Sequence, residues 1–165
     1  MVTDMKRSKN SQTVSNESTI RFNRILVAVD GSEDSIRAAR AAMTLCESLG
    51  VELSVVQAIP KPETRGMSVR LGPLLKDYYA ASVREAEKNI QRAVALAQKH
   101  GLKVTGKVLD YPNTTVEAIL DYAAGSGVDL IVVGTRGLGG FKKLVMGSVS
   151  TAIVNHASCS VLVVR

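Results

Sequence analysis

The chain has 165 residues, 45% of them hydrophobic and only 4% aromatic, and it carries a formal net charge of +6 with a pI near 9.5. This length suits one domain, and this hydrophobic fraction can bury a core without disulfide or metal cross-links. Two distant cysteines, Cys46 and Cys159, exclude a disulfide framework or a cysteine-based zinc site. Because no apolar run approaches the ~20 residues of a membrane helix and no secretory signal pattern is present, we expect a cytoplasmic protein with no membrane partner.

The N-terminal segment, residues 1–22, differs in composition from the rest of the chain. It is rich in Ser, Thr, Asn and Lys and has few apolar residues, so burial cannot offset the entropy cost of ordering it. Its four basic and two acidic residues give +2, which leaves +4 for the remainder. The sequence therefore predicts a disordered tail over 1–22, followed by one domain over 23–165.

Apolar runs and helical patterns alternate from residue 25 onward. Ile25–Val29 is predicted to be a buried strand, and Ser32 is predicted to cap a helix that ends at Leu49, before Gly50. Spacings of three and four place the following residues on the buried face of this helix: Ile36, Ala39, Met43, Cys46 and Leu49.

The same alternation continues to the end of the chain. A second strand is predicted over 53–59, a mobile loop over 60–73, and a long helix over 74–100 with an inner face of Val83, Ala86, Ile90, Val94 and Ala97. A third strand (102–109), a helix opened by a Thr114–Glu117 capping box, a fourth strand (129–133), a helix (148–156) and a last strand (160–164) follow. This order predicts an α/β domain with a parallel sheet and right-handed crossovers.

Two predicted strand ends carry residues suited to a ligand site. The first strand ends in Asp30-Gly31-Ser32, and the fourth runs into GTRGLGGFKKLVMGSVS (134–150), which holds five of the 13 glycines. Ligands of open parallel sheets bind at such carboxyl ends, where the strand order reverses. A Walker A loop is excluded because Gly140 stands where its lysine should be, and a dinucleotide fingerprint is excluded because Lys142 replaces its last glycine.

The remaining pattern is a different glycine spacing. Gly134 and Gly137 let the backbone turn sharply off the strand, and Gly147-Ser148 opens a helix whose free N–H groups can hold a phosphate. Lys142 and Lys143, in the intervening loop, could shield phosphate charge. On spacing alone, the alternative remains open that these glycines only serve a tight turn and a helix entry.

The segments ILVAVDGSEDS, VDLIVVGTRGLGG, KLVMGSVSTAIV and SCSVLVV, together with the full G-x2-G-x9-G-[ST] spacing, carry a resemblance over residues 24–165. The chain resembles the nucleotide-binding universal stress proteins. The resemblance implies a five-stranded parallel open sheet in the order 3-2-1-4-5 with helices on both faces, an adenine nucleotide α-hydrolase-like fold. It also implies a homodimer through the C-terminal strand, residues 159–165.

The resemblance further implies a set of residues that bind ATP or another adenine nucleotide. They are Ala28, Asp30, Ala58, Gly134, Thr135, Arg136, Gly137, Gly147, Ser148, Val149 and Ser150. By this resemblance, Asp30 lies beside the ribose or beside Mg or Mn bound to the phosphates. The backbone near Ala58 pairs with adenine. Gly134 and Gly137 approach the ribose and the phosphates, and the segment from Gly147 to Val149 holds the phosphates.

The sequence thus favours an ATP-binding regulatory domain of the stress response, with the preferred adenine nucleotide left open. One alternative is a slow ATPase or phosphotransferase that uses Asp30 and Mg, but no obvious general base accompanies Asp30, and His156 is expected to point away from the phosphates. The other is a nucleic-acid or interaction module built on basic residues, for which no dense basic block or RNA-binding aromatic motif is present. Its candidate contacts are Lys6, Arg7, Lys9, Arg65 and Arg70.

Overall fold

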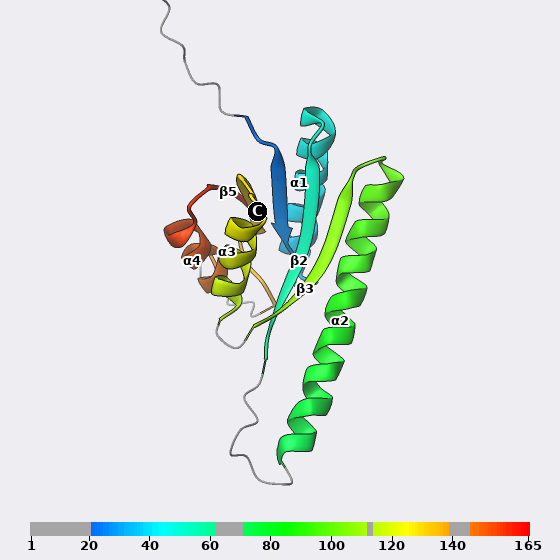
Figure 1. Ribbon diagram of the computed structural model, residues 1–165, viewed down its shortest axis with the longest axis vertical. Coiled ribbons are helices and arrows are strands. Elements are labelled where there is room, and N and C mark those ends of the chain that lie inside the picture. Colours follow the sequence, from blue (N-terminus) through cyan, green and yellow to red (C-terminus); the bar gives the residue numbers. More distant parts are fainter. Residues whose placement is uncertain (1–20, 62–70, 112–113, 139–145) are drawn as a thin grey trace, which may run out of the picture.

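The computed structural model describes residues 21–61, 71–111, 114–138 and 146–165. The strands are β1 (Arg24–Ala28), β2 (Glu52–Pro60), β3 (Val104–Tyr111), β4 (Leu130–Gly134) and β5 (Ser160–Val164). The helices are α1 (Glu33–Leu49), α2 (Leu71–Lys99), α3 (Thr115–Gly125) and α4 (Ser148–His156). All strand pairs are parallel and follow the order β3-β2-β1-β4-β5 (Figure 1). The predicted fold class and strand order are therefore confirmed.

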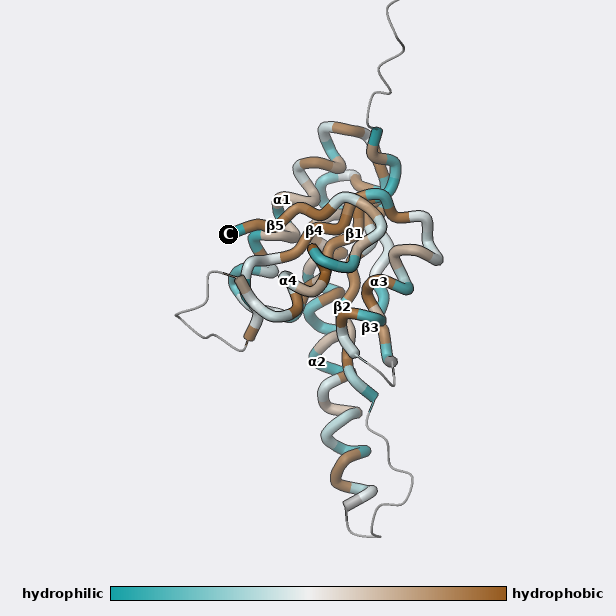
Figure 2. Tube along the Cα trace, turned by 90° about the vertical axis from the view of Figure 1, so that its left-hand side faces the viewer, coloured by the Kyte–Doolittle hydropathy of each residue, from teal (hydrophilic) through white to brown (hydrophobic). Residues whose placement is uncertain are grey.

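The helices cover both faces of the sheet. In Figure 1, α1 and α2 lie on one side of the strands and α3 and α4 on the other. Successive residues of β1 point to opposite faces, so Ile25 and Val27 pack under α1 and α2, while Leu26 packs under α3 and α4. Burial on both faces explains why the strands are continuous apolar runs, which Figure 2 shows as the hydrophobic centre of the domain.

The helix α1 has the predicted bounds, and its predicted buried face is confirmed at Ala39, Met43 and Cys46. Ile36 and Leu49, predicted to face the core, are 48% and 50% exposed, so this part of the prediction is wrong. The buried apolar residues are Ala38, Ala39, Ala42, Met43 and Cys46. Because alanine side chains are small, the helix axis can come close to the sheet when the alanines face it. This close packing favours burial of the alanines over burial of Ile36 and Leu49. Burial raises the pKa of the Cys46 thiol to about 11, which agrees with a core residue.

The helix α2 begins at Leu71, earlier than predicted, because Pro73 lies in its first turn, where the missing N–H costs no helical hydrogen bond. Its predicted inner face is confirmed by Ala86, Ile90 and Ala97, which are buried. In Figure 1 its first turns extend beyond the ends of the strands. Among the described residues, no helix is both long and apolar enough to cross a bilayer. The predicted tail, except its last two residues, and the central part of loop 60–73 lie outside the described residues.

Candidate functional site

A pocket of about 760 Å³ lies at the carboxyl ends of β1, β2 and β4. The predicted site residues that line it are Ala28, Asp30, Ala58, Gly134, Arg136, Gly137, Gly147, Ser148, Val149 and Ser150, that is, all of them except Thr135. The structure thus brings together residues from four separate segments of the chain. The pocket lies where the strand order reverses, between β1 and β4, which is the usual ligand position in open α/β sheets.

Asp30 joins the ends of β1 and β4. Its Oδ1 accepts a hydrogen bond from the Ser32 N–H (3.0 Å), and its Oδ2 accepts one from the Leu138 N–H (3.1 Å). A Cβ added at Gly137 would overlap Asp30 Oδ2. A side chain at Gly137 would therefore displace the Asp30 carboxylate, whatever ligand the pocket takes.

Gly134 also lies too close to another segment of the chain to carry a side chain. A Cβ at this position would lie 2.7 Å from the carbonyl carbon of Asp34 and 2.8 Å from its oxygen, so any side chain would push the first turn of α1 away from β4. Gly134 thus has a packing reason that depends on neither a ligand nor a tight turn, since its φ is not positive. Gly139, Gly140, Lys142 and Lys143 lie outside the described residues.

The carboxylate of Asp34 is the centre of a buried hydrogen-bond network that sequence reasoning missed. It accepts hydrogen bonds from Thr135 Oγ1 (2.7 Å), from the Arg136 N–H (3.1 Å) and from the Arg37 guanidinium. The Thr135 hydroxyl, followed by the charges of Arg37 and Arg136, lowers the pKa of Asp34 below its usual value, although burial opposes the shift. Asp34 is therefore ionised and holds Arg136 in place, with 3.6 Å between Oδ2 and Arg136 Nε.

The spacing of α1 contains a pattern that could have identified Asp34. Asp34 stands four residues before Ala38 and eight before Ala42, both fully buried, so it continues their row onto the inner face. An acid in such a row needs partners, because an unpaired buried charge is costly.

Thr135 and Ser150 are buried and fix α4 against the end of β4. The Thr135 carbonyl accepts hydrogen bonds from the Gly147 N–H (2.7 Å) and from Ser150 Oγ (3.0 Å). The Thr135 hydroxyl donates to Asp34 and does not line the pocket. The Ser150 side chain and the Thr135 carbonyl thus fix α4, whereas the Thr135 side chain holds Asp34 of α1.

The first turn of α4 presents free backbone donors to the pocket. Gly147 caps the helix in an extended conformation (φ −75°, ψ 162°) with no side-chain cap. The N–H groups of Ser148 and Val149 have no partner within the helix, and both residues line the pocket and are exposed. Free N–H groups, the positive end of the helix dipole and the Arg136 guanidinium make this end of the pocket suited to an anion.

The opposite end of the pocket offers uncharged backbone groups. The pairing of β1 with β2 ends at Ala28 and Val56, and the Val29 N–H donates to the Val56 carbonyl at 2.8 Å. Because backbone groups face alternate sides along a strand, Ala58 directs its N–H and C=O to the same side as Val56, beyond the end of β1. One donor and one acceptor side by side can recognise the edge of a planar, nitrogen-containing ring.

The described residues contain no group of three or more His, Cys, Asp or Glu that could hold a metal ion. Asp30 and Glu85 are the carboxylates among the residues that line the pocket, and Mg²⁺ is commonly held by one or two carboxylates together with phosphate oxygens and water. The residues present thus fit a metal ion that arrives with phosphates. His156 is exposed at the end of α4 and does not line the pocket.

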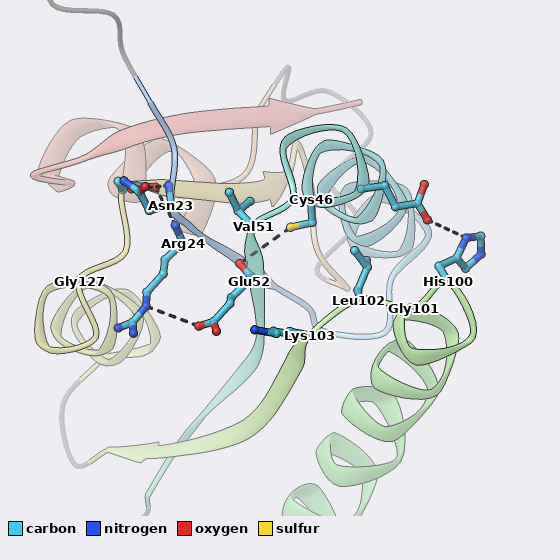
Figure 3. Close-up of a pocket in the computed structure, with 13 residues that line it drawn as sticks. Asn23, Arg24, Cys46, Val51, Glu52, His100, Gly101, Leu102, Lys103 and Gly127 are labelled. Atoms are coloured by element: carbon cyan, nitrogen blue, oxygen red, sulfur yellow. Dashed lines mark hydrogen bonds and ion pairs between the residues drawn. The ribbon is translucent and has the colours of Figure 1, made fainter.

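A second hollow, of about 900 Å³, lies at the opposite end of the sheet (Figure 3). Two pairs of side chains are in contact there, Arg24 with Glu52 (3.8 Å) and His100 with Glu47 (2.7 Å), and Lys103 and Asp129 also line the hollow. His100 lies just after α2, which ends at Lys99, and contacts Glu47 of α1. No predicted site residue lines this hollow, and its side chains carry charges of both signs.

Comparison with known proteins finds the same family by its sequence model and by individual relatives. The model of the universal stress protein family matches residues 21–165. A universal stress protein of Thermus aquaticus is 37% identical over 148 residues, covering 87% of this chain and 99% of the relative. The universal stress protein YxiE of Bacillus subtilis is 32% identical over 149 residues, covering 87% of this chain and 99% of the relative.

Solved structures have the same fold. Universal stress protein UspA of Lactobacillus plantarum superimposes with a TM-score of 0.78 at 24% identity, covering 88% of this chain and 99% of that one. The Archaeoglobus fulgidus protein in complex with dAMP has a TM-score of 0.66 at 22% identity, covering 88% and 100%. A universal stress protein in complex with cAMP has a TM-score of 0.66 at 23% identity, covering 88% and 99%. The family match over nearly the whole described chain, supported by these relatives, shows that the chain belongs to the universal stress protein family.

Proposed function

We propose that the protein binds an adenine nucleotide, ATP or a smaller relative, in the pocket at the carboxyl ends of β1, β2 and β4, and that occupancy of the pocket regulates a stress response. The observation that carries the proposal is the opposite character of the two ends of this pocket. Free N–H groups of α4 and Arg136 lie at one end, and the uncharged backbone of Ala58 lies at the other. The complexes of related proteins with dAMP and cAMP support the same ligand class.

This polarity suggests one orientation for the ligand. The phosphates approach Ser148 and Val149, where charge-assisted hydrogen bonds to N–H groups are strongest. The adenine edge meets Ala58, and the ribose lies near Asp30, whose carboxylate oxygens can each accept a second hydrogen bond. Glu85, on the wall that α2 contributes to the pocket, repels phosphate and so opposes the reversed orientation.

A divalent ion, Mg²⁺ or Mn²⁺, is part of the proposal only where the ligand carries several phosphates. Asp30 would hold it together with phosphate oxygens, and it would supply charge neutralisation. Asp30 itself then keeps its contacts to Ser32 and Leu138, which leave lone pairs of both carboxylate oxygens available. AMP is expected to bind without the ion, because Arg136 and the N–H groups of α4 suffice for one phosphate.

The test removes one backbone donor without disturbing the fold. Ser148 is the first residue of α4, a position where proline is favoured because that N–H is not used by the helix. Gly147 before it has the extended conformation that a following proline requires. We therefore expect Ser148→Pro to fold as stably as the wild type but to bind AMP about 10- to 100-fold more weakly, the weight of one hydrogen bond to a charged group.

Ser148→Ala is the matched control, because it removes the hydroxyl and keeps the N–H. Isothermal titration with AMP and ATP on the wild type and both variants measures the difference. Equal affinity of Ser148→Pro and the wild type would contradict phosphate binding at α4. Absence of saturable binding by the wild type to any adenine nucleotide would refute the proposed function itself.

We also propose a homodimer through residues 159–165. The strand β5 is at the edge of the sheet, and its Leu162 side chain is 36% exposed. An apolar edge strand with unpaired backbone groups is a natural site for association with a second copy. Cys159, half-buried at the start of this segment, would then lie near the interface.

A further inference from the structure

We propose that the side-chain amides of Gln57 and Asn89 form the part of the pocket that recognises the N6 and N7 edge of adenine, and that they make the site selective for adenine over guanine. This inference rests on the proposed function, because it concerns the base of the same ligand. Neither residue belongs to the glycine motif or to the set of site residues predicted from the sequence.

The two amides lie in the wall that α2 contributes to the pocket. This wall consists of residues on one face of the helix at spacings of four and three: Tyr78, Ser82, Glu85 and Asn89. Asn89 Nδ2 donates a hydrogen bond to Gln57 Oε1 at 3.2 Å. Gln57 directly precedes Ala58 on β2, so the amide pair lies beside the backbone groups assigned to the adenine ring.

The pair is held in place from two directions. Gln57 lies on the face of the sheet that α1 and α2 cover, and the bond to Asn89 ties its side chain to α2. The turn after β1 lies against Asn89 on its other side, since a Cβ added at Gly31 would approach Asn89 Nδ2 to 2.9 Å. Gly31 has φ +84°, so the turn itself favours glycine. A recognition group fixed by packing and hydrogen bonding loses little entropy when it binds.

The chemistry of the pair suits adenine. The mutual hydrogen bond uses one N–H and one C=O, and the other N–H groups and the other carbonyl remain available to a ligand. Asn and Gln amides pair with the N6 amine and N7 acceptor of adenine, whereas guanine presents two acceptors, O6 and N7, along the same edge. An amide carbonyl fixed beside N6 of adenine would therefore meet an acceptor in guanine, with no compensating bond.

The experiment compares AMP with 7-deaza-AMP, in which a C–H group replaces N7. The wild type is expected to bind 7-deaza-AMP about five- to tenfold more weakly, the weight of one neutral hydrogen bond. In Gln57→Met and Asn89→Leu, which keep the side-chain size, AMP affinity should fall and the difference between the two ligands should disappear. Gln91→Met removes an exposed amide from the same helix and should bind like the wild type.

The outcomes separate this inference from the proposed function. If the wild type binds AMP, and the AMP to 7-deaza-AMP ratio is the same in the wild type and both variants, the amide pair does not read the base, while the nucleotide site stands. Equal affinity of the wild type for AMP, 7-deaza-AMP and GMP overturns the inference even if the variants fail to fold. If the wild type binds none of these ligands, the proposed function fails first and the inference falls with it.

Discussion

Replacing Gly134 by alanine tests whether α1 is pressed against the end of β4 as described. The added Cβ would lie 2.7 Å from the carbonyl carbon of Asp34, 2.8 Å from its oxygen and 2.9 Å from its Cβ. Two of these atoms belong to the backbone, so no side-chain rotation can relieve the overlap, and the first turn of α1 must move. That movement would stretch the hydrogen bonds from Thr135 and Arg136 to the Asp34 carboxylate.

The size of the effect follows from these contacts. Overpacking by one methyl group costs about 1–3 kcal/mol, and weakening hydrogen bonds to a buried charge adds a cost of similar size. A shift of the helix relieves the overpacking but weakens the hydrogen bonds to Asp34. We therefore expect a loss of about 2–4 kcal/mol in the free energy of unfolding. For a domain of this length, that corresponds to a fall in Tm of roughly 5–15 °C.

The assay is urea and thermal unfolding followed by circular dichroism, with Gly125→Ala as the matched control. Gly125 is the last residue of α3, and a Cβ there would meet no atom within 4 Å. Alanine in a helix is more stable than glycine by about 0.5–1 kcal/mol, so this control should be neutral or slightly stabilising. If Gly134→Ala unfolds at the same urea concentration as the wild type, the packing argument for this glycine is wrong.

Three further predictions follow from other contacts. Asp34→Asn should lower the free energy of unfolding at pH 7 by about 1.5–3 kcal/mol. Because folding lowers the pKa of Asp34, the difference from the wild type should shrink as pH falls below about 4. A difference that does not change with pH would contradict the ionised network. Thr114→Ala should cost about 1 kcal/mol in urea unfolding, because it removes the capping box with Glu117; an unchanged midpoint would argue against that cap. Leu162→Lys should convert a dimer into a 17.6 kDa monomer by light scattering, and a wild type that is already monomeric would refute the β5 interface.

Much of the fold was predictable because local patterns determine its elements. The helix α4 was predicted with both correct ends, since Gly147 marks its start and the apolar run of the last strand begins soon after His156. Two residues of the inner face of α1, Ile36 and Leu49, were predicted wrongly because hydrophobicity alone favoured them over Ala38 and Ala42. The closeness of the helix to the sheet decides between these faces, and that distance depends on residues far away in the sequence.

The sequence predicted which residues line the candidate site, but it predicted only part of what each residue contacts. The spacing of Gly134 and Gly137 suggested a close approach of a ligand, but the structure shows that α1 and Asp30 already occupy the space beside them. The pair of Gln57 with Asn89 connects a strand to a helix 32 residues later, and no local pattern indicates such a contact. Long-range polar pairs of this kind become visible only once the fold brings the elements together.

The central claim is that an adenine nucleotide binds between β1, β2 and β4, and an NMR titration of the ¹⁵N-labelled wild type with AMP tests it most directly. Our account predicts saturable shifts of the backbone amide signals of Ala58, Gly137, Ser148 and Val149, while those of Gly50 and Gly101, in the hollow at the other end of the sheet, remain unchanged. Shifts confined to Gly50, Gly101 and their neighbours, or no saturable shifts at all, would contradict it.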